Sequence, residues 1–225
     1  MAGTELDICN RAIAKISGDP IDQLDEDSPL GVFCAQNYAP FRRMVLGKYR
    51  WSFARRDVLL TQVGVPDGVE KPLAFLFQRP ADLIGAVHAW RDQPDPQRGQ
   101  PLYVVETVDG FWCDQSRVYA ECTVAVAEDR WPGWFENLMV VAFAAELALH
   151  AQNGRLAESL TTQAWGVRSE NGEGGLYAQA RNEDARMAPQ RALTTAGVSP
   201  GPLVAVRAGG PGWGWDGSFI DPPGS

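Results

Sequence analysis

Residues 134–149 read WFENLMVVAFAAELAL, and this stretch decides the fold. Its apolar positions at helical spacing are Phe135, Leu138, Met139, Ala142, Ala145 and Leu149. A helix that is apolar on nearly every side has to be surrounded by other elements, so we expect this one at the centre of a core. The run contains Glu146 and is too short to cross a bilayer about 30 Å thick. The N-terminus also lacks the pattern of a signal peptide, so we expect a soluble protein made in the cytoplasm.

Two amphipathic helical patterns precede the central helix. The first begins at Thr4, a good N-cap with Asp7 in the first turn, and should end before Gly18. The second begins with Ser28-Pro29, an N-cap followed by proline at the first helical position, and contains Pro40, which should kink it. The two apolar stripes are Leu6, Cys9, Ile13 and Ile16, and then Leu30, Phe33, Cys34, Tyr38, Phe41, Val45 and Tyr49.

Helical spacing returns after the central helix, which Asn153-Gly154 should end. It runs from Arg155 to about Glu170, is interrupted by the NGEGG segment at 171–175, and continues from Leu176 to Met187. The NGEGG segment has glycines like a phosphate-binding loop but lacks its lysine and its preceding strand, so we expect a plain loop.

Between Asp57 and Ala127 the pattern changes to short segments rich in β-branched and aromatic residues. The expected strands are 58–60, 74–77, 85–90, 102–105, 117–120 and 123–126. Asp109-Gly110 suits a tight hairpin turn. The predicted fold class is therefore α+β: a helical bundle with an inserted small antiparallel β subdomain and an extended C-terminal arm. We divide the chain into bundle helices at 1–56 and 129–188, the β subdomain at 57–128, and the arm at 189–225.

Aromatic residues mark both the core and the arm. Trp51 and Phe53 end the second helix as aromatic anchors, and Trp134 and Phe135 begin the central helix, so we expect these four to anchor the core. The arm is rich in Gly and Pro yet carries Trp213, Trp215, Phe219 and Ile220. Burying large apolar groups offsets the entropy of ordering such a segment, which favours docking on another chain over folding back on its own domain.

The cysteines and histidines indicate no metal or redox site. Cys9 and Cys34 fall on the apolar stripes and suit a core. Cys113 and Cys122 could face each other across a hairpin, but a cytosolic protein keeps them reduced. His88 suits a strand and His150 a helix end, and the two lack the spacing of metal ligands. We therefore expect no metal and no cofactor.

The charge balance excludes two further classes. The 225 residues carry 20 Lys and Arg against 28 Asp and Glu, a net charge of -8. This net negative charge argues against non-specific binding to nucleic acid and against binding to anionic membranes. No nucleophile motif or P-loop is present in the sequence. The acidic loop Asp25, Glu26 and Asp27 could supply paired carboxylates for glycan hydrolysis, although such a run is usually a solvated charge cluster.

Four stretches carry a resemblance to a known family. They are Leu6-Asp7-Ile8-Cys9-Asn10-Arg11-Ala12-Ile13-Ala14-Lys15-Ile16; Asp27-Ser28-Pro29 with Cys34, Tyr38, Arg42-Arg43, Leu46 and Tyr49-Arg50-Trp51-Ser52-Phe53-Ala54; Phe77-Gln78-Arg79-Pro80-Ala81-Asp82; and Trp134-Phe135 through Ala144-Ala145-Glu146-Leu147-Ala148. In order and spacing they resemble phage head-to-tail adaptors of the tail tubular protein A type, over about residues 4 to 188. The sequence departs from that pattern at Arg79, where an apolar residue is usual, and at the glycines of 172–175. The arm after Pro189 does not align.

The resemblance implies a structural virion protein of the neck, between head and tail. Twelve copies would form a ring beneath the portal, without a cofactor and without covalent chemistry. The implied partners are the portal ring, the tail or nozzle protein, and other copies of the chain. Double-stranded DNA would pass through the lumen without sequence-specific binding, and Trp213, Trp215, Phe219 and Ile220 would dock on the portal.

Three alternatives remain open at this point. A tail-side neck or tail-completion protein would use the same helices. A virion-associated glycan hydrolase would need two carboxylates in a cleft, with Glu26 and Asp27 as candidates. A bacterial scaffold from a domesticated phage-like particle is the third.

Overall fold

The computed structural model describes residues 4–24, 27–65, 71–95, 98–167, 169 and 171–187. The described residues all belong to one compact unit. The predicted arm, with Trp213, Trp215, Phe219 and Ile220, lies outside the described residues, as do Asp25 and Glu26.

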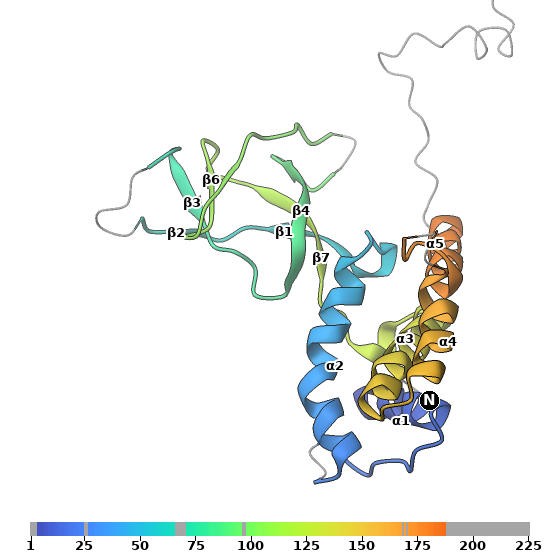
Figure 1. Ribbon diagram of the computed structural model, residues 1–225. Coiled ribbons are helices and arrows are strands. Elements are labelled where there is room, and N and C mark those ends of the chain that lie inside the picture. The colour runs from blue at the N-terminus through green and yellow to red at the C-terminus, as the bar shows by residue number, and fades with distance from the viewer. Residues whose placement is uncertain are drawn as a thin grey trace, which may run out of the picture. The chain divides into compact units, whose positions relative to one another are not determined.

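The described chain has the predicted α+β architecture (Figure 1). The helices are α1 (Glu5–Lys15), α2 (Pro29–Gly47), α3 (Gly133–His150), α4 (Gly154–Trp165) and α5 (Gly175–Met187), with two 3-10 turns, η1 (Ser52–Ala54) and η2 (Glu128–Arg130). The strands are β1 (Arg55–Leu59), β2 (Gln62–Val63), β3 (Phe75–Phe77), β4 (Leu83–Arg91), β5 (Val105–Glu106), β6 (Phe111–Cys113) and β7 (Tyr119–Val124). All the strands therefore lie between α2 and α3 in the sequence.

The central position of α3 is confirmed. Its side chains are buried from Leu138 through Ala145, as well as at Phe135 and at Leu147-Ala148. The other four helices, α1, α2, α4 and α5, all pack directly on α3. One of the α2 contacts is between Tyr38 and Phe143, whose ring centres lie 5.4 Å apart. Because α3 is apolar on every side, the helices that precede it and those that follow it in the sequence can all pack on it and form one core.

The predicted starts of α1 and α2 are confirmed, and so is the end of α1 before Gly18. Thr4 and Asp7 form a reciprocal capping box, and Ser28 caps α2 with Pro29 as its first residue. At the end of α1 the left-handed residue is Ser17, with φ of 59°. Gly18 follows it and donates its backbone N–H to the Ile13 carbonyl, a Schellman-type end. The second helix continues through Pro40 to Gly47.

The central helix ends at His150, and Asn153 takes part both in this end and in the start of α4, because its N–H donates to the Ala148 carbonyl at 2.9 Å. The left-handed residue after α3 is Gln152, with φ of 57°. Asn153 also begins α4, because its side chain accepts a hydrogen bond from the Leu156 N–H. Asparagine suits both roles, so the sequence alone does not separate an end from a start.

The strands form two antiparallel sheets rather than one, in the orders β1-β7-β4 and β2-β3-β6-β5. The strands expected at 117–120 and 123–126 are a single strand, β7, whose central residues are buried on both faces. The sequence reading missed β6, and the segment 102–105 contributes only the beginning of β5. Burial on both faces removes the polar alternation that would have marked one continuous strand.

The hairpin at Asp109-Gly110 is confirmed, whereas the facing of Cys113 and Cys122 was wrong. Val105 pairs with Trp112 across β5 and β6, and Asp109-Gly110 lies in the loop between these strands. Cys113 belongs to β6 and Cys122 to β7, which are in different sheets, and both thiols are free. Cys9 and Cys34 are buried in the helical core as expected.

The loop between α4 and α5 gives a stability test at Gly175. This residue has φ of 59°, and a Cβ there would lie 2.5 Å from the Gln163 carbonyl oxygen. Gly175→Ala should therefore lower the free energy of unfolding by about 2–4 kcal/mol. Gly154→Ala, where a Cβ meets nothing within 4 Å, is the matched control and should be neutral or stabilising by up to about 1 kcal/mol. Urea unfolding of both variants checks this, and equal losses would contradict it.

Candidate functional site at the helix–strand junction

The four predicted aromatic anchors come together where α2 gives way to β1. The ring of Trp51 is fully buried, with its centre 5.1 Å from that of Phe135 and 5.7 Å from that of Trp134. The Phe53 ring lies 4.9 Å from Phe135. The Trp51 indole N–H donates to the Val45 carbonyl at 3.2 Å, so its one polar atom is satisfied inside the core.

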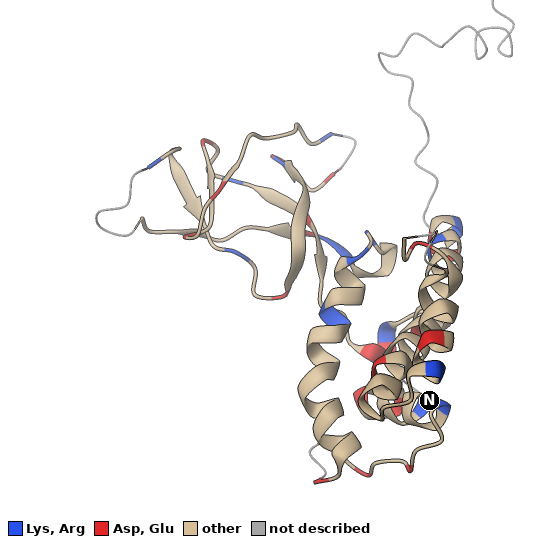
Figure 2. Cartoon of the chain, in the orientation of Figure 1, with Lys and Arg blue, Asp and Glu red and all other residues tan. Residues whose placement is uncertain are grey.

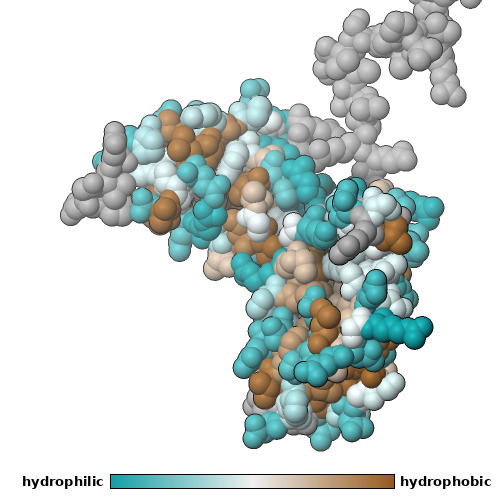
Figure 3. Space-filling view, viewed as in Figure 1, coloured by the Kyte–Doolittle hydropathy of each residue, from teal (hydrophilic) through white to brown (hydrophobic). Residues whose placement is uncertain are grey.

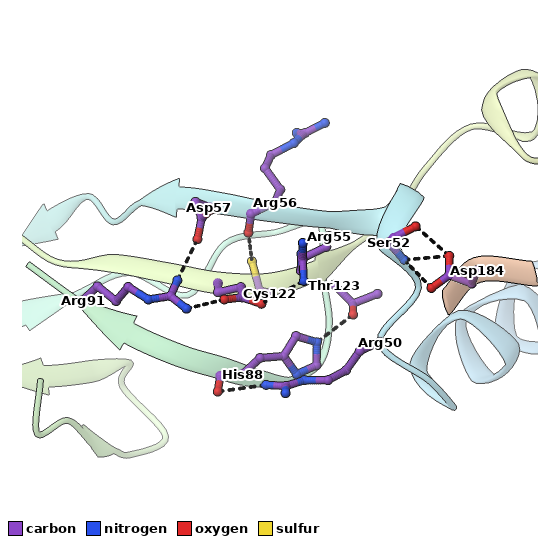
Figure 4. A network of polar contacts seen from close by, with 11 residues as sticks. Arg50, Ser52, Arg55, Arg56, Asp57, His88, Arg91, Cys122, Thr123 and Asp184 are labelled. Carbon is purple, nitrogen blue, oxygen red and sulfur yellow. Dashed lines mark hydrogen bonds and ion pairs between the residues drawn. The ribbon is translucent and has the colours of Figure 1, made fainter. Parts of the chain in front are cut away.

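A buried carboxylate fastens the same segment to α5. Asp184 accepts hydrogen bonds from the Ser52 backbone N–H at 3.0 Å and from the Ser52 hydroxyl at 2.7 Å (Figure 4). Because a buried carboxylate without donors is costly, these bonds fix the position of Ser52 against the helix. The residue next to the Trp51 anchor is thereby tied to the last helix of the described chain.

Two arginines near the end of α2 reach strand β4. The Arg50 guanidinium donates to the His88 carbonyl at 3.0 Å, and Arg43 donates to the Leu83 carbonyl at 3.3 Å. These two arginines thus supply hydrogen bonds to strand carbonyls, which links the α2 end to the sheet.

A third arginine of α2 contributes to a largely buried polar cluster. Arg42 pairs with Glu128 of η2 at 2.6 Å, and the Tyr38 hydroxyl donates to the same carboxylate at 3.2 Å. Burial and the Glu128 carboxylate raise the pKa of Tyr38, so this phenol stays protonated as a donor. The pKa of Glu5 is also raised, first by burial and then by Glu128. The cluster connects α2 to the turn that leads from β7 into α3.

Charged side chains also cross the three-stranded sheet (Figure 4). Arg91 of β4 pairs with Glu121 of β7 at 2.5 Å and with Asp57 of β1 at 3.2 Å, while Arg55 lies 3.6 Å from Glu121. The strand register places Asp57 and Ala89 beside Glu121, so these pairs join all three strands. Glu121 and Arg91 are mostly buried and have compensating charges, which suits a structural role.

The catalytic candidates are not assembled into a site within the described residues. Asp27 is exposed, and its neighbours Asp25 and Glu26 lie outside that part of the chain. His88 belongs to β4 and its Nε2 lies 2.9 Å from the Thr123 hydroxyl, while His150 ends α3 with its ring 4.5 Å from Phe33. Across the residues that the structure describes, no group of three or more His, Cys, Asp and Glu could hold a metal ion.

The two departures from the family pattern have visible structural roles. The Arg79 guanidinium lies over the Phe111 ring, 4.9 Å from its centre, and pairs with Glu106 at 2.6 Å, so the charge has both an aromatic and an acidic partner. The glycines at 172–175 form the connection between α4 and α5, and Gly174 donates to the Trp165 carbonyl at 3.0 Å. This confirms the loop interpretation of that segment.

No protein-family model matches the chain, and no curated protein matches it either. Among the described residues no helix has both the length and the apolar character needed to span a membrane.

Sequence reasoning missed the polar half of the junction. Glu128 and Asp184 lie among other charged residues, and Glu121 lies between two expected strands, yet all three are buried. Only Ser52, inside the Trp-Ser-Phe-Ala stretch, offered a signal, because a serine between two core aromatics invites a hydrogen-bond partner. The aromatic residues of the junction could be predicted from the sequence, because large apolar side chains are usually buried.

Removing the charge of Glu128 tests the polar cluster. Glu128→Gln leaves Arg42 without its counter-ion, so the free energy of unfolding should fall by about 1–3 kcal/mol. The neighbouring exposed Asp129 gives a matched control, and Asp129→Asn should stay within about 0.5 kcal/mol of the parent. Denaturant unfolding at neutral pH measures both, and indistinguishable losses would show that the cluster is not stabilising.

His88 predicts a pH dependence of stability. Burial, and then the Arg50 guanidinium, lower the pKa of His88 below its ordinary value of 6.5. The unfolded chain therefore binds the proton more readily, and stability falls as the pH drops through that value. His88→Gln keeps a side chain that can hydrogen-bond Thr123 but does not titrate, so the stability of this variant should fall less steeply between about pH 7 and about pH 5.5. Parallel curves for parent and variant would contradict this assignment.

Proposed function

We propose that the chain is a structural adaptor of a phage neck, which forms a ring between the portal and the tail and conducts DNA. The observation that carries this proposal is where the resemblance residues lie. Cys34, Tyr38 and Leu46 are buried in the helical core, and Trp51 and Phe135 form its aromatic junction. A resemblance that rests on packed core positions supports a shared fold more strongly than one that rests on exposed residues.

The junction suits an adaptor because it ties two different kinds of surface into one unit. Hydrogen bonds from Arg43, Arg50 and Ser52, together with the Arg42–Glu128 pair, link α2 with the strands, with η2 and with α5. Helices and strands thus form a single compact unit. An adaptor has to hold one partner at each end without bending between them, and buried polar links of this kind supply that stiffness.

The charge balance is compatible with a DNA conduit. A basic lumen would bind DNA through counter-ion release and slow its passage. The chain has a net charge of -8, so it has no overall electrostatic attraction for the phosphate backbone of DNA. We propose that the portal ring, the tail or nozzle protein and other copies of this chain are its partners, and that the neck of the virion is its location.

Native mass spectrometry of the portal ring from the same genome, before and after addition of the full-length chain, tests the proposal. We expect a gain of about twelve copies, because a ring that matches a twelve-fold portal closes with the same symmetry. A folded chain that leaves the portal mass unchanged would contradict portal binding. A gain seen only with tail components would instead support a tail-side neck protein.

The arm gives a second, sharper test of the same proposal. Trp213→Ala with Trp215→Ala should weaken portal binding at least about tenfold, since each buried tryptophan contributes a few kcal/mol. Trp213→Phe with Trp215→Phe is the matched control and should retain most of the binding, because it keeps an aromatic ring. Titration of each variant onto the portal ring, followed by native mass spectrometry, measures the loss. Equal binding by the alanine variant would remove the arm from the interface.

A further inference from the structure

Strand β1 lies at an edge of the three-stranded sheet. It pairs with β7 on one side, and the order of the sheet is β1-β7-β4. Figure 4 shows β1 along the upper side of the sheet, with β7 below it. The residues of β1 are exposed, except Val58, which is partly buried. An open strand edge carries backbone N–H and C=O groups that another extended chain can pair in register.

The register shows which backbone groups of β1 point out of the sheet. The Leu60 N–H, just past the strand, donates to the Val118 carbonyl at 2.9 Å. In an antiparallel ladder the backbone groups that face the partner strand recur at every second residue, so those of residues 56 and 58 also face β7. The N–H and C=O groups of Arg55, Asp57 and Leu59 therefore point outward, and they have no hydrogen-bond partner within the described part of the chain.

The opposite edge of the same sheet is covered. Two arginine side chains from the end of α2 donate to the carbonyls of Leu83 and His88 in β4. Figure 2 shows basic residues where the chain passes from α2 into the strands. Further along β4, the Leu102 N–H donates to the Trp90 carbonyl at 3.0 Å. Proteins protect sheet edges in this way against unwanted pairing, so the uncovered edge at β1 indicates a docking surface.

A second copy of β1 is a poor partner for this edge. In a symmetric antiparallel pair, one register places Asp57 opposite Asp57, and the register shifted by one residue places Arg56 opposite Arg56. Like charges directly opposite each other on neighbouring strands destabilise the pair. A register centred on Val58 pairs only residues 57–59. The edge therefore disfavours its own sequence and suits an extended chain of different sequence.

The surface beside the edge favours an apolar side chain in the added strand. Leu59 is 48% exposed, and with Pro80 and Ala81 it lines a hollow of about 170 Å³ at the end of β1. The space-filling view shows apolar groups that reach the surface among polar ones over the strands (Figure 3). In strand addition, backbone hydrogen bonds supply the affinity and pockets for alternate side chains supply the specificity.

We infer that β1 receives an extended segment of the tail or nozzle protein as an added strand, with an apolar side chain in the hollow at Leu59. The inference rests on the proposed function, in which the arm docks on the portal and the tail protein is the partner at the other end. It names the surface and the mode of contact on the tail side. A nucleic-acid backbone offers acceptors without alternating donors, so it cannot pair with this edge in register.

Amide hydrogen exchange of the full-length chain, with and without the tail protein from the same genome, tests the inference. An added strand pairs with the outward N–H groups, so the amides of Arg55, Asp57 and Leu59 should exchange at least about tenfold more slowly in the complex. The amides of Arg56 and Val58 already face β7 and should change much less. This two-residue period distinguishes an added strand from general shielding of the surface.

A proline at position 57 provides a second measurement. Proline lacks the N–H, and the Asp57 N–H points away from β7, so Asp57→Pro removes a bond to the added strand and keeps the existing ladder. Binding of the tail protein should weaken at least about tenfold. Asp57→Ala is the matched control, because it removes the same carboxylate and keeps the N–H, and it should bind within about twofold of the parent. The exchange measurement uses the unaltered chain, so it stands even where the proline variant fails to fold.

Binding of the tail protein with no protection in β1, or with uniform protection along it, would overturn the inference. Equal binding by folded Asp57→Pro and Asp57→Ala would overturn it too. Protection of the three outward amides in the free chain, or on addition of the portal alone, would assign the edge to another occupant and remove the tail protein from it. Alternating protection by the tail protein, in a chain that adds no mass to the portal, would keep the strand contact and remove the bridging role. The two proposals therefore fail separately.

Discussion

The burial of Trp51 is the constraint on which the described structure depends. Its ring packs against Phe135 at the start of α3 and against Tyr177 of α5, while its backbone neighbours lead from α2 into β1. The chain leaves the helical core and enters the strands at this point, and it returns to the core at η2 and α3. One large buried side chain at the crossing therefore fixes where the strands begin relative to the helices.

Around this aromatic contact, polar links restrict the remaining freedom of the junction. Asp184 holds Ser52, Glu128 holds Arg42, and Arg50 reaches β4. The first two of these links are partly buried, which strengthens them and makes their loss costly. Helices and strands are consequently expected to move as one body, which is what a protein that bridges two assemblies needs.

The sequence predicted the apolar part of this arrangement and missed the polar part. The all-round apolar pattern at Leu138 to Leu149 placed the central helix, and the Thr4 and Ser28 caps placed two helix starts. The pattern could not separate a helix end from a helix start at Asn153, where one residue type suits both. It also could not show that Glu121, Glu128 and Asp184 are buried, because their burial depends on donors that lie far away in the chain.

We expect the junction to belong to the cooperative core and not to open separately. Native-state hydrogen exchange of the full chain, followed residue by residue, tests this at the Ser52 amide, which donates to Asp184. We predict that Ser52 exchanges only through the same global unfolding that exposes the amides of α3, with the same dependence on denaturant. Exchange of Ser52 through a low-energy local opening, while α3 stays protected, would contradict the account.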